Sequence, residues 1–157
     1  MGQAMNEQAE IYPMPAFPTL TVRDPAASAR WYQDVLGFKH VFTIPGPGGI
    51  PLLVHLRWAR YADVLLRAQA DDTDDRPKGV GISLSFAVSD GRVDDVAERA
   101  RGRGAKLLSE PKDRPWNARD FSIADPDGFV LTFTQGPVDR GLGMDRIIKR
   151  STGAESR

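Results

Sequence analysis

The chain has 157 residues, of which 41% are hydrophobic and 27% are charged, as expected for one folded domain or two small modules. Its 21 Lys and Arg residues balance 21 Asp and Glu residues, so no net field favours nucleic acid as a partner. It contains no cysteine, which excludes disulfides, thiolate catalysis and zinc sites built from cysteine.

Residues 1–13 predict a flexible segment rather than a signal peptide, because residues 1–10 are polar and include no apolar stretch. No apolar run in the sequence approaches the roughly 20 residues that a membrane helix requires. We therefore expect a cytoplasmic protein with no membrane partner.

Residues 14–69 predict a first module with the element order βαβββ. Apolar and polar residues alternate over residues 17–24, which indicates a strand with Leu20 and Val22 on one face. Three further strands follow the helix and are expected over residues 38–44, 51–58 and 62–68.

The helix of this module has start and end signals. The Asp24 carboxylate caps free backbone N–H groups, and Pro25 fits the first turn. Gly37 is a typical C-terminal cap. Helical spacing predicts a core-facing side made of Ser28, Trp31, Val35 and Leu36.

Residues 70–79 are expected to link two modules. The acidic cluster at residues 71–75 lacks the central glycine and terminal glutamate of a calcium loop, which favours a solvated linker. The glycines of residues 45–49 precede no Lys-Ser/Thr pair and no helix, which favours a turn over a phosphate-binding loop.

Residues 80–136 repeat this pattern and predict a second βαβββ module. An alternating strand over residues 82–90 ends in Asp90, as the first strand ends in Asp24, and a helix is expected over residues 92–101. Three strands are then expected over residues 106–109, 119–124 and 129–135, the last two joined by a tight turn.

The predicted fold class is therefore α+β, with two βαβββ modules forming a curved mixed sheet with a ligand cup. Residues 137–157 are expected to form a polar tail. Within this tail, Met144, Ile147 and Ile148 are compatible with a short helix that contacts a partner.

Three segments resemble the vicinal oxygen chelate superfamily, which includes glyoxalases, extradiol dioxygenases and bleomycin resistance proteins. They are residues 20–24 (LTVRD), 31–38 (WYQDVLGF) and 121–128 (FSIADPDG). The resemblance extends from about residue 16 to residue 135 and implies the fold. It does not imply one function, because this fold supports many unrelated activities.

In the metal-using members of this superfamily, side chains from four strands hold the ion. The resemblance places Phe17, Ser83, Thr132 and a position near Leu66 at these points. Phenyl and isobutyl groups offer no donor atom, so we predict that the metal site is absent and that no other cofactor is bound. His55 matches no ligand position and is expected to fill a sheet face or form a structural hydrogen bond.

Strand alternation predicts an uncharged cup on the sheet face opposite the helices, suited to a planar, largely neutral ligand. Residues 114–121 (RPWNARDF) resemble a segment that lies beside the drug in bleomycin- and mitomycin-binding relatives. Two of the tryptophans that could contact the ligand have an alternative role: Trp58 could pack in the core, and Trp116 could cover a dimer seam or a sheet edge. The candidate ligand-binding residues are Phe17, Thr19, Phe42, His55, Trp58, Leu66, Ser83, Ser85, Trp116, Asn117, Phe121 and Thr132.

The resemblance implies a homodimer that sequesters a small aromatic natural product without a metal, as an antibiotic self-resistance protein does. Mitomycin-like quinones and enediynes fit the expected cup. One alternative is a glyoxalase-like lyase, isomerase or dioxygenase acting on a small organic substrate. Another is a regulatory module whose own side chains fill the cup. No catalytic residue is assigned from the sequence.

Overall fold

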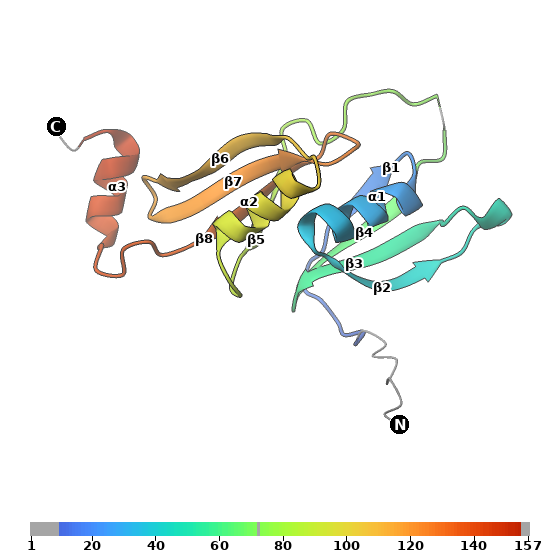
Figure 1. Ribbon diagram of the computed structural model, residues 1–157, viewed down its shortest axis with the longest axis horizontal. Helices are drawn as coiled ribbons and strands as arrows, with labels where there is room; N and C mark the ends of the chain where they lie inside the picture. The colour runs from blue at the N-terminus through green and yellow to red at the C-terminus, as the bar shows by residue number, and fades with distance from the viewer. Residues whose placement is uncertain (1–9, 72, 155–157) are drawn as a thin grey trace. The chain divides into compact units, whose positions relative to one another are not determined.

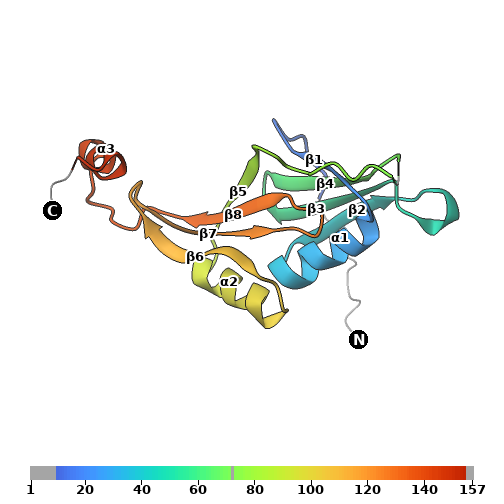
Figure 2. The same cartoon turned by 90° about the horizontal axis from the view of Figure 1, so that it is seen from above.

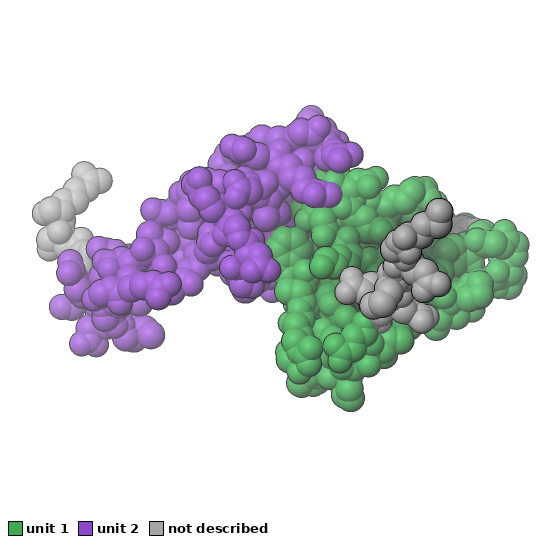
Figure 3. All heavy atoms as spheres, turned by 60° about the horizontal axis from the view of Figure 1, so that its bottom comes forward, with its two compact units in different colours: residues 1–76 green, residues 77–157 purple. Residues whose placement is uncertain are grey.

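The computed structural model describes residues 10–71 and 73–154 of the chain. The chain divides into two compact units between Arg76 and Pro77, inside the stretch expected to be a linker. Each unit contains one βαβββ module, which confirms the predicted α+β fold class (Figure 1). Figure 3 shows which atoms belong to each unit.

The first module contains a mixed sheet in the strand order β1-β4-β3-β2, with β1 parallel to β4 and the other pairs antiparallel. A short π-helix, η1, extends its α-helix, and a 3-10 turn, η2, lies between the second and third strands. The elements are β1 (Thr19–Val22), α1 (Pro25–Trp31), η1 (Tyr32–Leu36), β2 (Lys39–Ile44), η2 (Pro47–Gly49), β3 (Leu53–Ala59) and β4 (Ala62–Ala68).

The second module repeats this topology in the order β5-β8-β7-β6, with β5 parallel to β8. A last helix follows the sheet and contains no buried residue. The elements are β5 (Ser83–Ala87), α2 (Val93–Gly102), β6 (Leu107–Arg114), β7 (Ala118–Ala124), β8 (Val130–Gln135) and α3 (Met144–Thr152). Within the described part of the chain, no helix has the length and apolar character needed to cross a bilayer.

The end signals of the first helix act as the sequence predicts, but its buried face differs. The Asp24 Oδ1 atom accepts a hydrogen bond from the Ala27 N–H at 2.9 Å, and Gly37 ends the segment with a φ of 85°. Trp31 is half-buried, whereas Tyr32, which helical spacing does not assign to this face, is fully buried. The change to π-helical hydrogen bonding after Trp31 alters the angular spacing of the side chains.

Strand β6 is longer than predicted, because Pro111 does not interrupt it. This strand lies at the edge of its sheet, where a proline N–H is not needed for pairing. Two irregularities in the register, between Leu107 and Ser109 and between Ser109 and Lys112, accommodate the extra residues.

Stacked phenyl rings form the core of the second module. Phe86, Phe133 and Phe121 lie side by side on β5, β8 and β7, with ring centroids 5.6 and 5.4 Å apart. The α2 residues Ala97 and Ala100 are fully buried. Their small side chains let α2 pack closely on the sheet, at the β6, β7 and β8 strands that it contacts.

Candidate functional site

In each module, one helix covers one face of the sheet (Figure 2). The α1 helix packs on β3 and β4, and α2 packs on β6, β7 and β8. The opposite faces bear no helix among the described residues. We call them the first open face and the second open face.

The first open face consists of alternate residues from four strands, arranged in three rows by the strand register. The rows run across the strands, and the second of the three crosses the centre of the sheet. The rows are Thr21, Arg67, Leu53 and Ile44; then Thr19, Leu65, His55 and Phe42; and then Asp63, Arg57 and Lys39.

A buried ionic cluster lies at one end of the first open face. The Asp63 carboxylate, whose side chain is 0% exposed, accepts hydrogen bonds from Arg57 Nε and Nη2, both at 2.8 Å. His55 Nε2 lies 2.6 Å from Asp63 Oδ2. The hydrogen bonds with Asp63 raise the pKa of Arg57 above its ordinary value. Since each group has a partner, the cluster avoids the large cost of an isolated buried charge.

Two aromatic rings contact this cluster. The centroid of the Tyr12 ring lies 4.2 Å from the Arg57 guanidinium carbon. The Phe42 and His55 rings are close to perpendicular, with 5.0 Å between their centroids. Arg57 Nη1 also donates to the Glu10 carbonyl at 2.8 Å, and the Tyr12 hydroxyl accepts from a backbone N–H on the β3–β4 turn. Of the segment predicted to be flexible, residues 1–9 lie outside the described residues, and Glu10 and Tyr12 are bonded to the sheet.

Hydroxyl groups dominate the second open face. In its middle row, Ser122 Oγ and Thr132 Oγ1 form a hydrogen bond of 2.8 Å. Another row contains the buried Asp120, whose carboxylate accepts a hydrogen bond from Arg114 Nε at 2.6 Å. The rows are Ser83, Val130 and Ala124; then Ser85, Thr132, Ser122 and Ser109; and then Ala87, Thr134, Asp120 and Lys112.

The predicted uncharged lining is therefore wrong. The prediction rests on alternation along β1, β5 and β8, which contribute no charged residue to the open faces. The charged residues of these faces come from β2, β3, β4, β6 and β7. Asp63 and Arg67 alternate with the buried, helix-facing Val64 and Leu66, a pattern that is visible in the sequence of β4. That alternation was the signal that could have located the cluster.

The strand register places half of the candidate residues on the open faces. These are Thr19, Phe42, His55, Ser83, Ser85 and Thr132. Phe17 precedes β1 and is 48% exposed.

Three other candidates lie on the helix-facing side. Leu66 and Phe121 are 0% exposed core residues, so their assignment to a ligand surface is wrong. One residue along a strand reverses the face, and the open-face neighbour of Leu66 is Leu65. Trp58 packs against the buried Phe38 with 5.5 Å between ring centroids, which matches the core-packing alternative.

Trp116 and Asn117 lie in the turn between β6 and β7. Trp116 is 54% exposed. The Asn117 side chain donates from Nδ2 to the Asp139 carbonyl and accepts at Oδ1 from the Asp139 N–H, both at 2.8 Å. The Asn117 side-chain amide, which was expected to contact a ligand, therefore forms hydrogen bonds that hold the segment after β8 against this turn.

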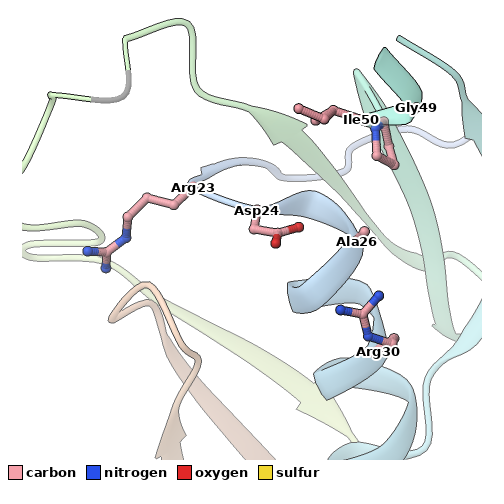
Figure 4. A pocket seen from close by; sticks show the side chains of 7 residues that line it. Arg23, Asp24, Ala26, Arg30, Gly49 and Ile50 are labelled. Carbon is pink, nitrogen blue, oxygen red and sulfur yellow. The ribbon is translucent and has the colours of Figure 1, made fainter. Parts of the chain in front are cut away.

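A separate pocket of about 390 Å³ lies at the start of α1, and none of the candidate residues lines it. Figure 4 shows Arg30 projecting from α1, while Arg23 points away from Asp24 and Arg30. The Asp24 carboxylate is engaged in capping the helix. Because its two arginines do not converge, this pocket is not the main candidate site.

The model of the Glyoxalase/Bleomycin resistance protein/Dioxygenase superfamily matches residues 15–133. This chain belongs to that superfamily. The match spans both modules and confirms the resemblance seen in the sequence.

Several other proteins resemble the chain along most of its length. The uncharacterized protein Rv0887c of Mycobacterium tuberculosis is 27% identical, over 94% of this chain and 90% of the relative. A glyoxalase/bleomycin resistance protein from Streptomyces sp. CB03234 is 27% identical with a TM-score of 0.56, covering 76% of this chain and 97% of its own. TioX from Micromonospora sp. ML1 is 24% identical with a TM-score of 0.60, covering 76% and 95%.

The side chains at the superfamily's metal positions do not fit a divalent ion. Phe17 has no donor, and the open-face residue of β4 nearest the fourth position is Leu65. Ser83 and Thr132 offer only neutral hydroxyls, which are weak ligands beside imidazole or carboxylate. The described residues contain no group of three or more His, Asp or Glu side chains placed to hold a metal.

Proposed function

We propose that the open faces bind a small, planar organic molecule and sequester it without a metal. The observation that carries this proposal is the first open face, a helix-free sheet surface with aromatic, apolar and hydrogen-bonding groups in adjacent rows. Phe42 offers a stacking surface beside Leu53 and Ile44, and Thr19 and Thr21 offer hydroxyls. The superfamily name includes bleomycin resistance proteins, which supports an antibiotic as the ligand class.

Simple energetics are compatible with this role. Removing about 200 Å² of apolar ligand surface from water contributes about 5 kcal/mol before the costs of association. Homodimerisation would bury more of the same ligand, and we include it, with a cytoplasmic location, in the proposal. Sequestration requires only that one ligand binds per site and leaves unchanged.

Calorimetric titration with mitomycin C and 1,8-dihydroxyanthraquinone tests this proposal. We expect saturable, stoichiometric binding of at least one compound in the micromolar range. Thr19→Phe, which places a phenyl group on the first open face, should weaken binding at least tenfold. Glu98→Phe is the matched control, because Glu98 is exposed on α2. Wild-type protein that binds neither compound would refute the proposal.

One observation favours the enzymatic alternative. A carboxylate that holds an imidazole, as Asp63 holds His55, is an arrangement that general bases use. Mass spectrometry of the recovered ligand separates the two functions. Unchanged ligand after prolonged incubation supports sequestration, whereas conversion that His55→Asn abolishes supports a lyase or isomerase.

A further inference from the structure

The first open face has an excess of positive charge. Its rows contain Arg57, Arg67 and Lys39 but one carboxylate, Asp63, and Asp63 is bonded to Arg57. Glu10 is not part of these rows. Its carboxylate lies 3.6 Å from the guanidinium of Arg60, a residue of the β3–β4 turn. The charge excess therefore resides in Arg67 and Lys39, at opposite ends of the sheet.

Arg67 differs from the other arginines of the open faces. Arg57 and Arg114 are each bonded to a buried aspartate. Arg67 is exposed, and within the described ranges its one side-chain hydrogen bond is from Nη2 to Thr21 Oγ1, at 3.2 Å. A guanidinium has five N–H donors in a planar fork, so most of this donor set faces solvent.

The row that contains Arg67 is otherwise apolar beyond Thr21. Leu53 pairs with Arg67 and Ile44 pairs with Leu53, and Phe42 lies in the adjoining row. A cation at one end of an apolar and aromatic strip is complementary to a flat molecule with an acidic group at its edge. The strip would contact the ring system while the guanidinium fork binds both oxygens of a carboxylate.

We propose that the first open face selects a planar aromatic carboxylate, with Arg67 as its ion-pair partner. This inference rests on the proposed function, which it narrows from a planar organic molecule to an acidic one. It replaces the neutral ligand that the sequence favours. The reason is the β4 register, which places a guanidinium on the same face as Phe42 and Leu53.

A matched ligand pair tests the inference. Anthraquinone-2-carboxylate and anthraquinone-2-carboxamide share a ring system and differ in charge. Both would be titrated calorimetrically into the wild type, Arg67→Gln, Arg67→Lys and the control Arg103→Gln. Arg103 is exposed at the end of α2, so its variant removes the same charge from a different module. Circular dichroism would establish that each variant is folded.

We expect the wild type to bind the acid about tenfold more tightly than the amide, as a charge-assisted, two-point contact allows. Arg67→Gln should remove this preference without weakening the amide, Arg67→Lys should retain part of it, and Arg103→Gln should match the wild type. Equal binding of acid and amide would overturn the inference and leave the proposed function standing. Failure of both compounds to bind, together with failure of the quinones above, would overturn the proposed function as well.

Discussion

The two open faces share a topology but differ in how their polar groups are satisfied. The first face contains a buried carboxylate with three hydrogen bonds from two side chains, Arg57 and His55. The second contains hydroxyl groups and a single arginine contact to Asp120. Repetition of the βαβββ unit therefore fixes which residues share a face, but it does not fix the chemistry of that face.

This difference indicates separate roles. A buried, fully bonded cluster holds its side chains in one geometry, which suits orientation of a ligand or a proton. Neutral hydroxyls such as Ser85 and Thr132 adapt their donors and acceptors to a partner. We expect changes in the first face to affect stability more strongly than changes in the second.

Replacing the buried aspartates gives the largest expected effect. Asp63→Ala leaves the half-buried Arg57 guanidinium and the buried His55 ring without the carboxylate that they share, and we expect a loss of about 3–5 kcal/mol in the free energy of unfolding. Asp120→Ala should cost less, about 1–3 kcal/mol, because Arg114 donates one hydrogen bond to Asp120 through Nε and also donates to Ser109 through Nη2. Urea unfolding at pH 7 measures both.

The double variant Arg57→Met with Asp63→Leu is the control for this prediction. Removing both charges together should recover most of the loss, since neither ion is left unpaired. If Asp63→Ala and Asp120→Ala cost the same, the contrast between the two faces would be wrong.

The hydroxyl pair of the second face should have a smaller effect. Thr132→Val keeps the shape of the side chain but removes the oxygen that lies 2.8 Å from Ser122 Oγ. We expect a loss of about 1 kcal/mol, the usual net contribution of a neutral hydrogen bond. A double-mutant cycle with Ser122→Ala, measured by urea unfolding, isolates the pair. A coupling energy near zero would show that water satisfies both hydroxyls equally well.

The sequence is sufficient to predict the fold for reasons that are local. Asp24 with Pro25 and the Asp125–Gly128 turn mark where elements begin and end, and alternation assigns Val22 and Phe133 to the core. The sequence predicts too short a β6, because the effect of a proline depends on whether its strand lies at an edge, which only the pairing reveals.

The site is less predictable, because it depends on contacts between strands. Arg57 and Asp63 are ordinary surface residue types, and only the β3–β4 register places them opposite each other. The predicted position at Leu66 is one residue away from the open-face residue Leu65, and one residue is enough to reverse the face. The two hydrogen bonds between Asn117 and Asp139 join residues that are separated in the sequence by all of β7 and β8, so no local sequence pattern predicts them.

The smallest expected effect on stability comes from an ion pair on the helix-facing side of the second module. This pair lies on neither open face, so its acid sensitivity can be measured independently of them. Arg119 on β7 bonds Asp94 of α2 through Nε and Nη2, at 2.8 and 2.7 Å. These bonds hold the pKa of Asp94 below its ordinary value of 3.8. The stabilisation is therefore complete above that value and is lost as the pH falls through the lower pKa of the folded state.

We expect Asp94→Asn to cost about 0.5 kcal/mol at pH 7, because the pair is partly exposed and screened by solvent. The difference between the wild type and this variant should shrink toward zero as the pH falls through the lowered pKa of Asp94, because the wild-type carboxyl then loses its charge as well. Glu98→Gln, on the exposed side of the same helix, is the matched control for the loss of one carboxylate from α2. A difference that stays constant with pH would mean that packing, rather than the ion pair, joins α2 to the sheet at this point.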